Sequence, residues 1–178
     1  MVRHRANNIG IYMRRFLVSF LFIPLLVSAA QSTPDETSAA LWRALSNDPG
    51  ASADVATLKR LFHPDAVVFG VHYKDGVANM RRTAIGDFLS SQEAVSGKGF
   101  YECEVAREIK VYDRYAVVQS VVESRRDKAA INLTLVGINS LQLYKAGTEW
   151  KIMSLYYQVE KQGEPIHLGN GKSGQCLA

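Results

Sequence analysis

Strand-forming residues are most concentrated in residues 137–160, which read GINSLQLYKAGTEWKIMSLYYQVE. β-branched and aromatic side chains occupy both halves of this segment, and Gly147 lies in the connection between them. The pattern predicts two long strands joined by a turn of about five residues. A lone hairpin is only marginally stable in water, so helices or further strands must cover one of its faces.

Three earlier segments place apolar residues at helical spacing and predict three helices. The first begins with Thr33, Pro34 and Glu36, which form a capping box with proline at the first helical position. The second follows Ser52 as its predicted cap, and the third covers residues 82–93. All three helices therefore precede the long strands, which begin at residue 100.

The other predicted elements are strands. A short hairpin is expected at residues 66–73 and 77–80, and longer strands at residues 100–112, 115–123 and 131–144. The last segment, residues 161–178, is rich in glycine and is expected to be irregular. Helices followed by a run of antiparallel strands indicate the α+β class.

Residues 100–112 alternate between two chemical types. Odd positions are apolar except Arg107, and even positions are mostly charged. This period of two predicts that the odd positions face the core and the even positions face water. From residue 131 onward both faces are apolar, which predicts helices against one face and a partner subunit against the other.

The N-terminal residues predict a secretory signal peptide. Arg14 and Arg15 precede an apolar run over residues 16–27, and small residues end at Ala29 and Ala30, where cleavage is expected. The run is shorter than the roughly 20 residues that span a bilayer, although an uncleaved anchor is the alternative. We therefore expect residues 1–30 to be a signal peptide, residues 31–160 one domain and residues 161–178 a tail, in a periplasmic or secreted protein without stable membrane insertion.

Removal of residues 1–30 also removes the chain's excess of positive charge. That segment contains four arginines and no acidic residue, which leaves 17 basic and 17 acidic residues. The domain is therefore not predicted to bind nucleic acid.

Two cysteines remain, Cys103 and Cys176. In an exported protein they suggest a disulfide between a strand and the tail, and the alternative is a buried Cys103 with a free Cys176. No spacing of cysteine and histidine is typical of a metal site, so neither a metal nor another cofactor is predicted.

Three segments together resemble the nuclear transport factor 2-like superfamily, and within it the SnoaL-like branch. They read LFHPDAVV at residues 61–68, VYDRYAVVQSVVES at 111–124 and LQLYKAGTEWKI at 141–152. The resemblance implies a cone-shaped curved antiparallel sheet packed on three N-terminal helices, with a pocket between them, and homodimers through the sheet are common in that group.

The resemblance also permits a comparison with ketosteroid isomerase, which needs a carboxylate base and a tyrosine. Gly70 stands at the position of the base, and the tyrosine position falls near Leu41. Both groups are absent, so steroid isomerase activity is not expected.

Four candidates for chemistry lie near the first strand. Asp65 is a possible general base, but an aspartate after a helix commonly binds local backbone amides instead. His72 and Tyr73 end the strand near the expected pocket rim, where a histidine can exchange protons, although a solvated hairpin end explains both. His63 is explained by the helix terminus at which it lies.

The later strands supply four candidates for ligand binding. Arg107 interrupts an apolar face, and Glu123 is its predicted carboxylate partner. A structural ion pair is the alternative, as is a bulge near Ala106 that turns Arg107 toward solvent. Asn139 and Tyr156 lie in the middle of the closing hairpin, where they are expected to point into the pocket.

These features support three hypotheses about function. The first is an exported pocket protein that binds a small, partly apolar molecule without assigned catalysis. The second is a general acid–base enzyme, such as a dehydratase, cyclase or isomerase, that uses His72, Tyr73 or Asp65. The third is a dimeric interaction module of the cell envelope.

Overall fold

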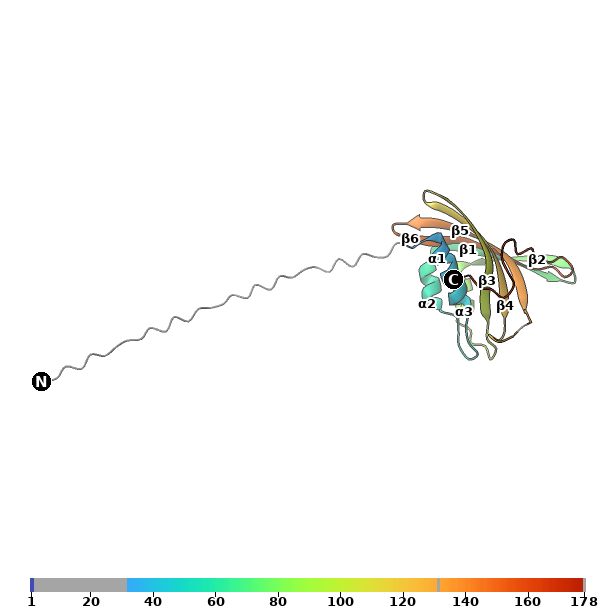
Figure 1. Cartoon of the computed structure of the whole chain (residues 1–178), viewed down its shortest axis with the longest axis horizontal. Helices are drawn as coiled ribbons and strands as arrows, with labels where there is room; N and C mark the ends of the chain where they lie inside the picture. The colour runs from blue at the N-terminus through green and yellow to red at the C-terminus, as the bar shows by residue number, and fades with distance from the viewer. Residues whose placement is uncertain (2–31, 131, 178) are drawn as a thin grey trace.

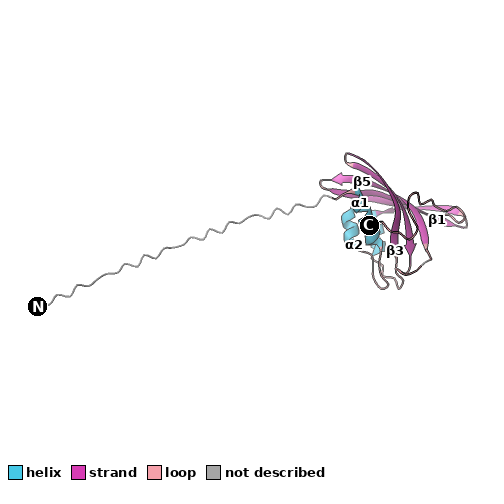
Figure 2. Cartoon of the chain, viewed as in Figure 1, coloured by secondary structure: helices cyan, strands magenta, loops and turns pink. Residues whose placement is uncertain are grey.

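A computed structural model describes Met1, residues 32–130 and residues 132–177. The predicted signal peptide therefore lies outside the described residues, apart from Met1. Three helices pack against one side of a curved sheet (Figure 1 and Figure 2). No helix in the described ranges is both long enough and apolar enough to span a membrane.

The helices are α1 (Pro34–Leu45), α2 (Val55–Leu61) and α3 (Ile85–Gln92). The capping box at the start of α1 is confirmed: the hydroxyl of Thr33 accepts from the Glu36 amide, and the Glu36 carboxylate accepts from the Thr33 amide. The cap of α2 is Asp54 instead of the predicted Ser52. The third helix is shorter than predicted, because the residues before Ile85 continue the preceding strand.

The strands are β1 (Phe62–Lys74), β2 (Val77–Ala84), β3 (Tyr101–Tyr112), β4 (Tyr115–Arg125), β5 (Leu135–Ala146) and β6 (Glu149–Val159). They form one sheet in the order β2-β1-β6-β5-β4-β3. β1 and β6 are parallel, and the other neighbouring pairs are antiparallel. The predicted hairpin of residues 137–160 is β5–β6, and it forms the centre of the sheet.

The core lies between the helices and the inner face of the sheet, which is the face that the helices cover. Leu41 of α1 and Leu58 of α2 are fully buried there. They belong to one cluster with inward side chains of β5 and β6, among them Leu141 and Ile152. Alternation along each strand sends the next side chain to the opposite, outer face.

A β-bulge in β3 changes which residues face the helices. Glu104 pairs with Val122 and Ala106 with Val121, so Val105 is the extra residue. Before the bulge, the even positions face inward and Cys103 faces outward. After it, the odd positions Arg107 and Ile109 face inward. The predicted uniform alternation of residues 100–112 is therefore wrong in its first half.

The tail covers the outer face of β3 and β4. A disulfide joins Cys103 to Cys176, so the alternative of a free Cys176 is wrong. Ile166 and Leu168 of the tail pack on the outward side chains of Val105 and Val121. The apolar outer surface that predicted a partner subunit is thus partly covered by the chain's own C-terminal segment.

Candidate functional site

A cavity of about 260 Å³ lies between the inner face of the sheet and the helices. Its apolar lining comes from the helices, from Phe100 just before β3, and from β4, β5 and β6, and it includes Trp42, Leu45, Phe88, Phe100, Val122, Leu135, Val136, Leu155 and Val159. Its polar lining is smaller and comes from six different elements: His72, Gln92, Glu102, Ser124, Asn139 and Tyr157. The cavity is therefore apolar with a few polar groups, which is the usual composition of a small-molecule site.

Glu102 is the acidic residue of the cavity lining. The alternation before the bulge in β3 turns its side chain inward, beside Ser124, its register partner on β4. Burial raises the pKa of Glu102 from 4.5 to about 7, and the adjacent Ser124 hydroxyl opposes this increase. Within the described part of the chain, no basic side chain forms an ion pair with Glu102.

His72 and Tyr157 form a pair at the exposed side of the cavity. Tyr157 Oη lies 3.3 Å from His72 Nε2, and the two rings meet edge to face with centroids 5.5 Å apart. Burial raises the pKa of the Tyr157 phenol, against the opposing charge of Arg81. His72 is exposed, so it lies at the rim and not inside the cavity.

Gly70 makes room for this pair. It is the register partner of Tyr157, and a Cβ on Gly70 would lie 2.3 Å from Cζ and Oη of that ring. Where the resemblance to ketosteroid isomerase expects a carboxylate, the chain therefore places a tyrosine ring over a bare backbone. Leu41, at the expected tyrosine position, is fully buried in the core.

Asn139 is the one ligand-binding candidate that the structure places in the cavity lining as predicted. It is buried, and its side-chain amide donates to the carbonyl of Gly137 at 3.1 Å. This local bond holds the side chain in a fixed orientation on β5.

Three other candidates lie outside the cavity lining, which corrects their predicted positions. The Asp65 side chain is 87% exposed, beside His63. Tyr73 faces the outer side of the sheet, where its hydroxyl accepts from Gln158 at 3.0 Å. Tyr156 also faces outward, and it donates to Gln158 at 3.0 Å. The inward tyrosine of the pair is its neighbour Tyr157.

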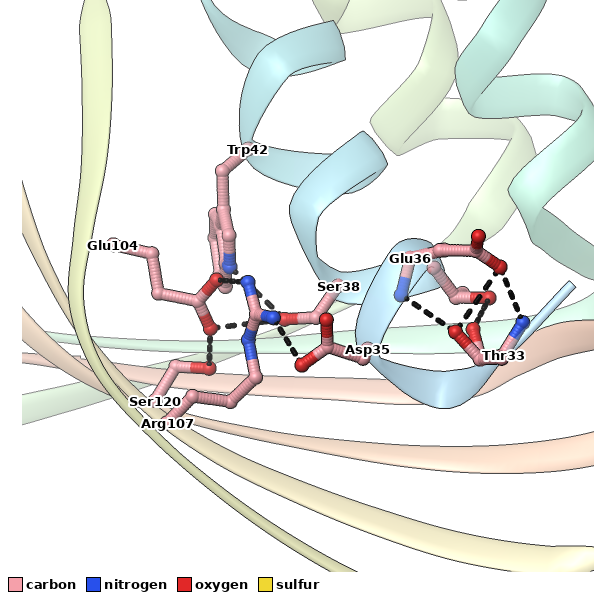
Figure 3. Close-up of polar contacts among 9 residues, drawn as sticks. Thr33, Asp35, Glu36, Ser38, Trp42, Glu104, Arg107 and Ser120 are labelled. Carbon is pink, nitrogen blue, oxygen red and sulfur yellow. Dashed lines mark hydrogen bonds and ion pairs between the residues drawn. The ribbon is translucent and has the colours of Figure 1, made fainter. Parts of the chain in front are cut away.

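Arg107 faces α1 in a closed polar network (Figure 3). Its guanidinium forms ion pairs with Glu104 and Asp35, and the predicted pairing with Glu123 is wrong. Burial opposes the positive charge, but the two carboxylates outweigh it and raise the pKa of Arg107. The bulge is present as the sequence suggested, but it buries the guanidinium, only 6% of whose side chain is exposed, instead of turning it to solvent.

The same network fixes Glu104 to α1. Ser38 donates to the Glu104 carboxylate at 3.0 Å, and the indole of Trp42 donates to Ser38 at 3.2 Å (Figure 3). Ser120 donates to the same carboxylate oxygen. The charges of Glu104 and Arg107 are thus paired, and among the buried side-chain polar atoms of the described residues only Nε of Arg107 lacks a hydrogen-bond partner.

Glu123 lies on the outer face under the tail. It is buried and accepts from the Gly174 amide at 2.9 Å and from Arg125 at 3.0 Å. Burial would raise the pKa of Glu123, but hydrogen bonds from Ser173, Gly174 and Arg125 lower it overall. Glu123 therefore holds the tail, which corrects its predicted role in ligand binding.

Two further features of the structure bear on where a ligand could bind. Across the described residues, no three side chains of the metal-ligating types come together. A second, more open hollow of about 520 Å³ separates the tail from the outer face of β3 and β4. It is lined by Arg107, but the charge of that residue is already paired, so the inner cavity is the better candidate.

Sequence reasoning missed Glu102, Ser124 and Tyr157. A strict alternation in residues 100–112 assigned Glu102 to water, whereas the bulge turns it inward. Arg107 was the available signal in the sequence. A charged residue among the apolar odd positions of residues 100–112 indicates that the alternation shifts within the strand. For the adjacent pair Tyr156 and Tyr157, the sequence required one ring on each face but did not say which.

Comparison with known proteins identifies the architecture. No family model matches the sequence, and no curated protein is similar to it. A protein with a cystatin-like fold and unknown function from Nostoc punctiforme PCC 73102 aligns with a TM-score of 0.54 and 15% identity, over 73% of this chain and 90% of that chain. An NTF2-like protein of unknown function from Shewanella baltica OS155 aligns with a TM-score of 0.51 and 15% identity, over 71% and 90%.

A candidate ketosteroid isomerase from Parabacteroides distasonis ATCC 8503 aligns with a TM-score of 0.50 and 13% identity, over 76% of this chain and 94% of that chain. At such identities the likeness establishes the fold and does not transfer an activity. The α+β class and the curved sheet packed on three helices are confirmed. The chain therefore has the nuclear transport factor 2-like, or cystatin-like, fold.

Proposed function

We propose that the chain binds a small, partly apolar molecule in the cavity between its sheet and helices, with Glu102 as the main polar anchor. The observation that carries this proposal is a carboxyl group that faces an apolar cavity without an ion-pair partner among the described residues. A buried polar group costs stability unless something compensates it. Binding of a ligand to the carboxyl group of Glu102 would compensate this cost in stability.

The size of the cavity limits the ligand. An engineered apolar cavity of about 150 Å³ holds benzene, and pockets for drug-sized molecules span roughly 300–1,000 Å³. A volume of about 260 Å³ suits a molecule somewhat larger than benzene. The expected ligand is therefore a small metabolite, with Asn139 and the His72–Tyr157 pair as secondary polar contacts.

A cavity-blocking variant tests the proposal. Gly137 lines the cavity, and a Cβ there would meet no heavy atom closer than 3.5 Å, so Gly137→Leu can direct a side chain inward. Native mass spectrometry of protein purified from its own compartment should detect a small molecule on the natural chain and none on Gly137→Leu. The matched control is Gln142→Leu, at an exposed position.

Two results would count against cavity binding. One is a natural chain that carries no molecule and whose melting temperature no metabolite in a library raises. The other is a Gly137→Leu variant that folds and retains the same molecule.

A general acid–base enzyme is the second candidate, and one observation favours it. A carboxyl group with a pKa of about 7 can both accept and donate a proton near neutral pH. In this version Glu102, and not Asp65 or Tyr73, is the acid–base group, with His72 at the rim. Turnover of a bound molecule that is lost in Glu102→Gln would favour the enzyme, and binding without turnover would favour the pocket protein.

We also propose export and self-association, as the sequence predicts. The disulfide between Cys103 and Cys176 supports an oxidising compartment. Tyr115, Tyr144 and Tyr156 are exposed large side chains of the sheet and support contact with a second copy through the outer face that the tail leaves open. A monomeric mass in solution at micromolar concentration would refute the dimer.

A further inference from the structure

Three glutamates of the described chain face inward from the sheet or lie buried under the tail, and two of them have an ion-pair partner within the fold. Glu104 has Arg107 and two serines, and Glu123 has Arg125 and the tail amides. Among the described residues, the carboxyl group of Glu102 has Ser124 alone beside it. Each of these two structural glutamates, Glu104 and Glu123, has an arginine partner within the fold. The unmatched carboxyl group is the one that lines the cavity.

Within the part of the chain that the structure describes, the cavity walls around Glu102 contain no lysine or arginine. Among the described lining residues, those from α1, α3, β4 and β5 carry no titratable group, β1 contributes His72, and β6 contributes Tyr157. The guanidinium of Arg126 lies 5.5 Å from the centroid of the Phe100 ring, but Arg126 is not part of the lining. The interior of the cavity thus contains one acidic group, Glu102, among mainly apolar walls.

The aromatic lining of the cavity also favours a positively charged ligand. Trp42, Phe88 and Phe100 come from α1, α3 and the approach to β3, so they surround the cavity from the helix side. Aromatic faces attract cations because their π-systems are negative at the centre. The Glu102 carboxylate would repel an apolar anion in the cavity. A neutral molecule would leave the negative charge of that carboxylate without a counter-charge.

We infer that the ligand is a compact apolar cation, such as a primary amine on a single ring or a branched alkyl group, whose ammonium pairs with the Glu102 carboxylate. This inference rests on the proposed function and specifies its ligand class. The ammonium would donate to the oxygens of Glu102, and the apolar body would lie against the aromatic walls. The cavity volume of about 260 Å³ accommodates one such ring and its side chain.

The test compares three probes of one shape: benzylamine, benzyl alcohol and benzoate. Titration calorimetry at pH 6 and pH 8 measures their affinities for the full chain. Glu102 is mostly protonated at pH 6 and mostly ionised at pH 8, so benzylamine should bind about tenfold more tightly at pH 8. At pH 7 its binding should release about half a proton, measured in buffers of different ionisation enthalpy.

Three variants assign the effect to Glu102. Glu102→Gln should lose about tenfold or more of the benzylamine affinity at pH 8 and should lose the pH dependence. His72→Gln should keep the pH dependence, which separates the rim histidine from the cavity carboxyl. Asp65→Asn removes an exposed carboxylate outside the cavity and should change nothing.

The outcomes separate this inference from the proposed function. Benzyl alcohol or benzoate binding as tightly as benzylamine, or an affinity that rises as the pH falls, overturns the cationic ligand but leaves cavity binding intact. A benzylamine affinity that Glu102→Gln retains also overturns it. If no probe binds and the native chain carries no molecule that Gly137→Leu excludes, both proposals fail.

Discussion

Glu102 and Glu104 lie two residues apart on one face of the same strand, yet the structure treats them differently. Glu104 faces α1 and is held by Arg107, Ser38 and Ser120. Glu102 faces the cavity with Ser124 as its only partner in the described chain. The comparison shows that strand position decides which way a carboxylate points, whereas the neighbouring elements decide whether it serves stability or remains free for a ligand.

The β-bulge makes this contrast possible. In a regular strand, residues three apart face opposite sides, so Glu104 and Arg107 would be separated by the sheet. The extra residue Val105 brings both to the inner face, where they pair. The arginine that could have compensated Glu102 is therefore committed to Glu104 and Asp35.

The largest effect is expected from removal of the partner of Glu104. Arg107→Met leaves a buried carboxylate without its charge partner and should lower the free energy of unfolding by about 3–5 kcal/mol. Urea denaturation measures the loss, with Arg114→Met, at an exposed turn, as the matched control. The double variant Glu104→Gln with Arg107→Met should recover much of it, and no recovery would contradict the assigned ion pair.

A smaller effect is expected on the opposite face, where Cys103 lies between the two glutamates in sequence. Its disulfide closes a separation of 73 residues. Replacement of Cys103 and Cys176 by alanine should lower the free energy of unfolding by about 2–4 kcal/mol. The inner face should stay intact, so the pH-dependent binding of benzylamine should persist. Loss of that binding in a folded variant would show that the tail also organises the cavity.

The smallest effect is expected from Glu102→Gln, and its sign depends on pH. Because the pKa of Glu102 rises from 4.5 to about 7 on folding, its contribution to stability is complete below pH 4.5 and is lost as the pH rises through about 7. Relative to the natural chain, Glu102→Gln should therefore gain about 2–3 kcal/mol between pH 4 and pH 8. Denaturation at both pH values measures the gain, and a constant difference would contradict the raised pKa.

Much of the fold follows from local patterns in the sequence. Thr33, Pro34 and Glu36 specify the start of α1 within four residues, so no tertiary information is needed. Strand formers around Gly147 similarly specify β5–β6. The parallel pairing of β1 with β6 was not predicted. It joins residues about 85 positions apart in the sequence, such as Gly70 and Tyr157, so no local pattern indicates it.

The candidate site was less predictable because it depends on which face each side chain takes. Asn139 lies in the cavity lining as predicted, since β5 alternates regularly around it, and its role in ligand binding stays a prediction. Glu102 was missed because one extra residue reverses the alternation of β3. Glu123 was assigned to the wrong partner because the tail that binds it is irregular, and an irregular segment leaves no periodic signal of the surface it covers.

Gly70 has a consequence for how this fold could acquire another activity. A carboxylate introduced at residue 70 would collide with the ring of Tyr157, whose atoms lie 2.3 Å from the position of the new Cβ. Replacing Tyr157 first by a smaller residue would leave His72 without its neighbour and open a void beside the backbone. Neither substitution is favourable alone, so a carboxylate at residue 70 requires both changes at once.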